Sequence, residues 1–67
     1  MLYTIQVSNG ARAAAQWETV YDGPIATTRD ARDACNNLRL WYRNVRAFRG
    51  RHTIGRLWFE YYGNPFA

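Results

Sequence analysis

The chain contains no lysine, one cysteine and one histidine. A disulfide needs two cysteines and a structural zinc site needs four ligands, so an internal disulfide is excluded and no metal is expected. The five glycines are scattered, so there is no phosphate-binding glycine loop and we expect no cofactor. A 67-residue domain therefore lacks the usual devices that stabilise small folds, and self-association remains as one way to bury more surface.

Long apolar runs are missing as well. No stretch approaches the roughly 18 residues that a membrane-spanning helix needs. The opening residues, "MLYTIQVSNG", have neither the basic region nor the continuous apolar segment of a secretory signal. We expect a single domain over residues 1–67, located in the cytoplasm, with no membrane partner.

Catalytic patterns are scarce. Ser8 and Cys35 have only His52 as a partner base, and nothing around them resembles a nucleophile elbow. Asp30 and Asp33 lie where carboxylates stabilise the start of a helix. The sequence therefore predicts a protein that is not an enzyme, with no catalytic residues.

Acidic residues are nearly absent from the second half of the chain. Residues 1–35 carry three arginines against four acids, whereas residues 36–67 carry six arginines against one acid. Six guanidinium groups create a positive potential that attracts anions, and we predict that they bind one: Arg39, Arg43, Arg46, Arg49, Arg51 and Arg56. The alternatives are a solvated flank whose side-chain stems cover apolar neighbours, or an arginine bias inherited from codon usage.

The order of secondary structure follows from hydrophobic periodicity. Residues 2–7 and 17–22 alternate with period two, and residues 53–62 are rich in aromatic residues, so each predicts a strand. Residues 45–49 are either a continuation of the preceding helix or a strand; we favour the strand because Gly50 follows at once. The fold class is α+β, a small antiparallel sheet with one helix on one face, in the order ββαββ or, alternatively, ββαβ.

The helix has the clearest pattern. Thr27 is placed to cap its start, with Asp30 three residues later, and Asn44 is a plausible left-handed cap at its end. Apolar residues recur at helical spacing at Ala31, Ala34, Cys35, Leu38, Trp41 and Tyr42. A second stripe consists of Arg32, Asn36, Arg39 and Arg43. We expect Cys35 to be a core thiol.

Alternation also predicts the two sheet faces. The face under the helix is predicted to hold Tyr3, Ile5, Val7, Val20, Val45, Ala47, Gly55, Leu57, Phe59 and Tyr61. The open face is predicted to hold Thr4, Gln6, Thr19, Arg46 and Arg56 with five aromatic anchors for a partner: Trp17, Tyr21, Phe48, Trp58 and Tyr62. Such a face suits stacked bases, a protein interface, or a second copy of the chain in a homodimer.

"WETVYDGP…TTRDARDAC" followed by "LRLWYRNVRAF", within residues 17–49, resembles small orphan proteins of phages and prophages. The resemblance implies a bacterial host and a protein that binds and disables a host machine, as anti-CRISPR proteins do. The leading hypothesis is therefore a phage-type inhibitor of a host protein or nucleoprotein complex. The alternative is a direct binder of single-stranded DNA or RNA that uses the open face of the sheet.

Overall fold

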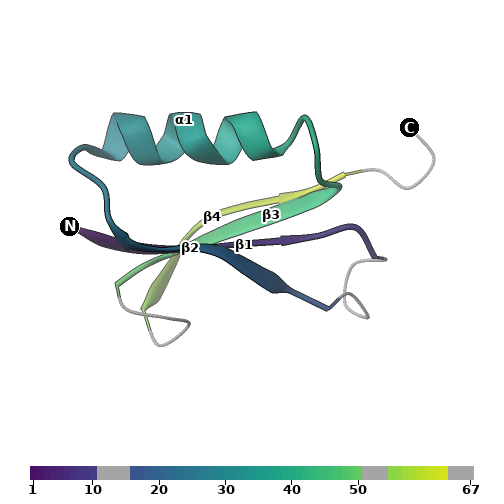
Figure 1. The fold of residues 1–67 in the computed structure, drawn as a ribbon, viewed down its shortest axis with the longest axis horizontal. Helices are drawn as coiled ribbons and strands as arrows, with labels where there is room; N and C mark the ends of the chain where they lie inside the picture. The colour runs from purple at the N-terminus through teal and green to yellow at the C-terminus, as the bar shows by residue number, and fades with distance from the viewer. Residues whose placement is uncertain (11–15, 51–54, 64–67) are drawn as a thin grey trace.

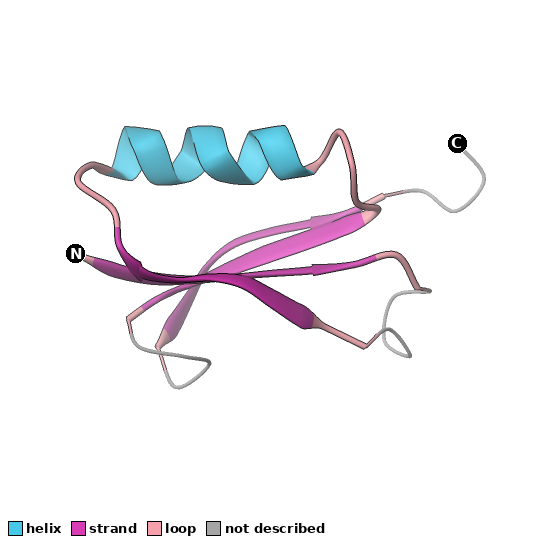
Figure 2. Ribbon diagram, in the orientation of Figure 1, coloured by secondary structure: helices cyan, strands magenta, loops and turns pink. Residues whose placement is uncertain are grey.

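The computed structural model describes residues 1–10, 16–50 and 55–63. These residues form four strands and one helix in the order β1 (Leu2–Ser8), β2 (Glu18–Pro24), α1 (Thr28–Leu38), β3 (Asn44–Arg49) and β4 (Arg56–Tyr62). The strands form one antiparallel sheet in the order β2-β1-β3-β4. The helix lies across one face of this sheet (Figures 1 and 2). The α+β class, the order ββαββ and the strand at 45–49 are thus confirmed.

The start of α1 is the predicted one, but its end is not. The Asp30 amide donates to the Thr27 hydroxyl over 3.0 Å, as an N-cap requires. The helix stops at Leu38, well before Asn44, which instead begins β3. Asn44 is fully buried and its side-chain amide donates to the Gly10 carbonyl, 2.8 Å away, so it belongs to the sheet rather than to a helix cap.

The core lies between α1 and the two central strands. Ile5 and Val7 of β1 and Val45 and Ala47 of β3 form one buried cluster with Cys35 of the helix. The helix contributes only the small side chains of Ala31 and Cys35 as fully buried groups, which lets it lie close to the sheet. The prediction that Cys35 is a core thiol is confirmed, and burial raises its pKa to about 11, although Arg32 opposes the shift.

A β-bulge in β4 changes which residues face the helix. Phe59 lies opposite Ala47 and Leu57 opposite Phe48, so Trp58 is the extra residue. Trp58 and Phe59 consequently both pack against the core, whereas Leu57 is 46% exposed. The prediction that Trp58 faces outward and Leu57 inward is therefore wrong, because strict alternation fails at a bulge.

The start of β4, before this bulge, also faces the opposite way to the prediction. Arg56 lies opposite Arg49, which in turn lies opposite Tyr3 on the helix side, so the prediction that Arg56 belongs to the open face is wrong. Gly55 serves the β3–β4 hairpin rather than the helix. A Cβ atom at Gly55 would lie 2.6 Å from the Arg49 carbonyl oxygen, a distance that only glycine tolerates.

A second bulge reverses part of β2. Tyr21 lies opposite Ile5 and Thr19 opposite Gln6, which leaves Val20 as the extra residue. Because Ile5 faces the helix, Tyr21 does as well, and its placement on the open face is a wrong prediction. A bulge adds one residue to a strand and bends it locally, and simple period-two alternation does not reveal its position.

Candidate anion-binding surface

The open face of the sheet is organised around Arg46. The arginine Nε donates to the Gln6 side-chain oxygen over 2.7 Å, and Gln6 donates in turn to the Thr19 hydroxyl over 3.2 Å. The guanidinium carbon lies 4.1 Å from the centroid of Trp17 and 5.2 Å from that of Phe48. We call Arg46, Gln6, Trp17 and Phe48 the Arg46 cluster.

The aromatic rings of the Arg46 cluster are covered by contacts with other residues of the same face. Trp17 and Phe48 are only partly exposed, and Trp17 also meets the edge of Tyr62 with ring centroids 6.0 Å apart. The positive charge is offset by Glu60, directly opposite Arg46 in the neighbouring strand. Glu60 also accepts a hydrogen bond from the Tyr62 hydroxyl, and burial together with this carboxylate raises the Tyr62 pKa. The predicted platform of free aromatic rings is therefore largely covered by its own arginine.

A second arrangement of arginines and rings joins α1 to β4. The Arg32 guanidinium carbon lies 5.2 Å from the centroid of Trp58, and that of Arg39 lies 4.0 Å from the centroid of Tyr61. We call these four residues the arginine–aromatic row. Arg32 and Arg39 are exposed, whereas the two rings are partly buried beneath them.

The spacing of the row follows from the geometry of its two elements. Seven residues along a helix and three along a strand each span about 10 Å, so two contacts at positions 32 and 39 can align with rings at positions 58 and 61. The helix and β4 run in the same direction (Figure 1), as this alignment requires. The two arginines are thus held about 10 Å apart on a rigid layer.

The guanidinium groups of Arg32 and Arg39 contact uncharged groups, namely aromatic rings and an amide oxygen. Besides Tyr61, Arg39 contacts the side-chain oxygen of Asn36, to which it donates over 3.2 Å. Arg32 stacks on Trp58, which itself meets the edge of the buried Tyr3 with centroids 5.1 Å apart. Aromatic rings and amide oxygens hold a guanidinium in place without cancelling its charge, so the row keeps its attraction for anions.

The six arginines predicted to bind an anion do not form one patch. Arg39 joins the row, Arg46 lies on the opposite face, and Arg43 is exposed in the segment between α1 and β3. Arg49 and Arg56 lie opposite each other at the far end of β3 and β4, where Arg49 also contacts the Met1 sulfur. Arg51 and His52 lie outside the described residues.

Sequence reasoning missed Arg32 and Tyr61 as site residues. The sequence pattern places Arg32 in the helical arginine stripe, seven residues from Arg39 and on the same helix flank, but the predicted binding surface does not include it. Tyr61 lies on the helix side of the sheet, as predicted, but the sequence pattern assigns it no binding role. The helical spacing of Arg32 and Arg39 was the signal that could have identified the row.

Residues 1–10, 16–50 and 55–63 contain no group of three or more His, Cys, Asp or Glu side chains arranged to hold a metal ion. Nor does that part of the chain contain a helix with the length and apolar character needed to cross a membrane.

In the described part of the chain, the fold and the row define a small α+β protein with one helix on a four-stranded antiparallel sheet and two arginines over aromatic rings along one side of the helix. No known protein family, curated protein or solved structure matches the chain.

Proposed function

We propose that the protein is a non-enzymatic binding protein that holds single-stranded nucleic acid on the arginine–aromatic row. The observation that carries the proposal is a pair of exposed guanidinium groups, each of which lies over a ring and forms no ion pair with a carboxylate of the described residues: Arg32 over Trp58 and Arg39 over Tyr61. Arg43 and Arg56 extend the positive charge beyond the two ends of the row.

The stacking favours a single strand over a duplex. A guanidinium that lies on an aromatic ring presents its outer plane to solvent, and unstacked bases pack on such planes. Its N–H groups meanwhile donate to phosphate oxygens. Because each ring already restricts its arginine, less side-chain entropy is lost when the nucleic acid binds.

The competing explanation is that Arg32 and Arg39 only cover Trp58 and Tyr61 with their stems. Glutamine variants separate the two explanations, because glutamine keeps part of the stem and removes the charge. If the arginines only cover the rings, the variants lose stability and bind nucleic acid as the parent does.

The experiment is a fluorescence anisotropy titration of a labelled 20-nucleotide oligothymidylate at several salt concentrations. With about four phosphate contacts, the logarithm of the affinity should fall against the logarithm of salt with a slope of about −3. The double variant Arg32→Gln, Arg39→Gln should bind at least about tenfold more weakly and with a slope shallower by about 1.4, because two phosphate contacts are lost.

Arg46→Gln is the matched control, since it removes the same type of charge from the opposite face. Its affinity for oligothymidylate should stay within about twofold of that of the parent, because the loss of one charge from the net charge has only a small effect. A salt-independent affinity, or equal weakening by Arg46→Gln and by the double variant, contradicts the proposal.

The hypothesis of a phage-type inhibitor requires that the chain binds a host protein or nucleoprotein complex. Affinity capture from a bacterial lysate, with and without nuclease, tests this binding. Material lost after nuclease treatment is held through nucleic acid, whereas a discrete complex that remains is held through protein.

A further inference from the structure

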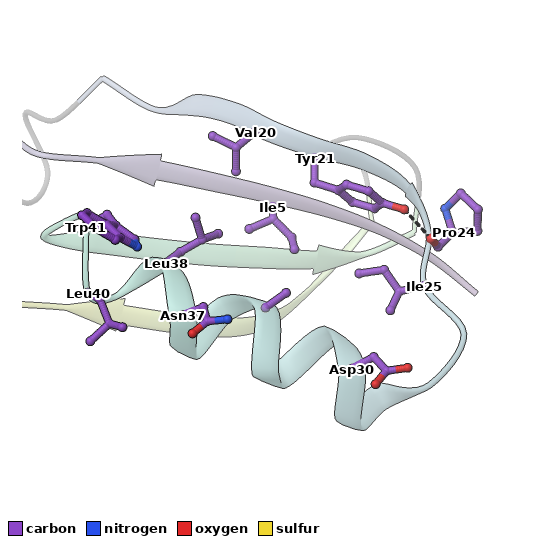
Figure 3. A pocket seen from close by; sticks show the side chains of 11 residues that line it. Ile5, Val20, Tyr21, Pro24, Ile25, Asp30, Asn37, Leu38, Leu40 and Trp41 are labelled. Atoms are coloured by element: carbon purple, nitrogen blue, oxygen red, sulfur yellow. Dashed lines mark hydrogen bonds between the residues drawn. The ribbon is translucent and has the colours of Figure 1, made fainter.

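The helix covers only part of the sheet. Four strands spaced about 4.8 Å apart span about 15 Å between the outer strands, whereas a helix with its side chains is about 10 Å across. Helix α1 packs on β1 and β3, and its arginines reach the rings of β4. The helix side of β2 consequently has no layer above it among the described residues, and Figure 3 shows the helix to one side of this strand.

This uncovered strip is an apolar groove of about 780 Å³ between α1 and β2. Figure 3 shows Val20 and Tyr21 of β2 on one side, with Leu38 of the helix and then Leu40 and Trp41 on the other. Val20 and Tyr21 both face this side because of the bulge in β2. Tyr21 is held there because its hydroxyl donates to the Pro24 carbonyl at the end of the groove.

Two residues at the groove are unusually exposed for their type. Trp41 is 77% exposed and Leu40 is 76% exposed, because the chain leaves the helix at Leu38 and carries both side chains past its end. The prediction that Trp41 belongs to the buried helical stripe is therefore wrong. Exposed tryptophan beside an apolar groove marks a binding surface, since tryptophan is enriched among the residues that dominate interface energies.

The charges at the groove have one sign. Asp30 is the charged residue that lines it, on the helix flank opposite Arg32 and Arg39. Glu18 of β2 is exposed and lies opposite Val7, hence on the same sheet face as the groove. The helix therefore separates a basic flank over β4 from an acidic flank over β2, although the whole chain has a net charge of +4.

We propose that the groove binds an amphipathic helix of a partner protein, whose apolar stripe lies on β2 beside α1 and whose flanks carry lysine or arginine. A second helix at the usual separation of 8–10 Å completes the layer above the sheet. Its apolar residues contact Val20, Leu38 and Trp41, and its basic residues meet Asp30 and Glu18. A second copy of the chain facing groove to groove would instead bring the acidic residues of both copies together.

The test uses two synthetic 18-residue peptides, one of leucine and lysine and one of leucine and glutamate, with leucine at the same helical positions in both. Binding to the full chain is measured by isothermal titration calorimetry. The groove should bind the lysine peptide at least about tenfold more tightly. Attraction to the net charge of +4 alone would favour the glutamate peptide, so the two explanations predict opposite preferences.

Variants identify the surface. Trp41→Ala should weaken binding of the lysine peptide at least about tenfold, because a central tryptophan anchor is lost. Asp30→Asn should reduce the preference for lysine about two- to fivefold. Leu57→Ala is the matched control, since Leu57 is an exposed apolar residue of β4, away from the groove, and it should leave binding unchanged.

Three results would overturn the proposal: a glutamate peptide that binds equally or better, a Trp41→Ala variant that binds like the parent, or a homodimer in sedimentation that Trp41→Ala dissociates. The last result would assign the groove to a second copy. Oligothymidylate binding by the same Trp41→Ala variant should be unchanged, so this test and that of the arginine–aromatic row fail independently.

Discussion

Trp58 faces the helix because of the bulge in β4. This placement can be tested by replacing Trp58 and its neighbour Leu57 with alanine, one at a time, and comparing the two losses of stability. Alanine at Trp58 removes a ring that packs against the core, meets Tyr3 at 5.1 Å and supports Arg32 at 5.2 Å. Truncating a buried tryptophan costs about 3–5 kcal/mol. Because Trp58 is only partly buried, we expect Trp58→Ala to lower the free energy of unfolding by about 2–4 kcal/mol.

That loss is large for a chain of this size. A 67-residue domain has a total stability of roughly 3–10 kcal/mol, so Trp58→Ala should unfold at much lower urea concentration and be partly unfolded in water at the weaker end of this range. Leu57→Ala removes a side chain that is 46% exposed and should cost less than about 1 kcal/mol.

The assay is urea unfolding followed by circular dichroism. The midpoints of the two variants are compared provided that the m-value, the slope of the unfolding free energy against urea concentration, is the same. The expected order of midpoints is the parent, then Leu57→Ala close behind, then Trp58→Ala far below. The reverse order, with Leu57→Ala the more destabilised, would show that β4 alternates without a bulge and would refute the assignment of the two faces.

Two further predictions concern buried polar groups. Cys35 is fully buried and its pKa is raised from 9.0 to about 11, so the folded state retains a proton that the unfolded state loses first. Stability should therefore fall as the pH rises from about 9 towards 11, measured by urea unfolding across that range, and Cys35→Ala should remove this part of the pH dependence. The Tyr3 hydroxyl is buried without a hydrogen-bond partner among the described residues, so Tyr3→Phe should raise the melting temperature because an unsatisfied group is removed. A lower melting temperature for Tyr3→Phe would indicate a hydrogen bond from that hydroxyl.

The elements were predictable where local rules determine them. Thr27 caps the helix through a contact three residues away, and the alternation of Ile5 and Val7 or Val45 and Ala47 reflects a face that is buried along regular strands. The end of the helix was not predictable in this way. The helix ends at Leu38, and Asn44 donates to the Gly10 carbonyl in a distant part of the chain, a tertiary contact that the local pattern does not contain.

The candidate site was predictable only in outline. The composition predicted arginines and aromatic residues as candidate binding groups, and the structure brings Arg39 over the ring of Tyr61. The single basic and aromatic surface was not found, because two bulges turn Tyr21 and Trp58 towards the helix and Arg46 covers Trp17 and Phe48. A bulge of one residue moves the side chains on one side of it to the opposite face of the sheet, so an error in register becomes an error about which residues share a surface.

The central claim is that single-stranded nucleic acid lies on the arginine–aromatic row rather than on the open face of the sheet. The most direct measurement is a nuclear magnetic resonance titration of the ¹⁵N-labelled protein with oligothymidylate, following the arginine Nε and tryptophan indole signals. The account predicts that the signals of Arg32, Arg39 and Trp58 shift together while that of Arg46 stays in place. Shifts confined to Arg46 and Trp17, or no shifts at saturating oligonucleotide, would contradict it.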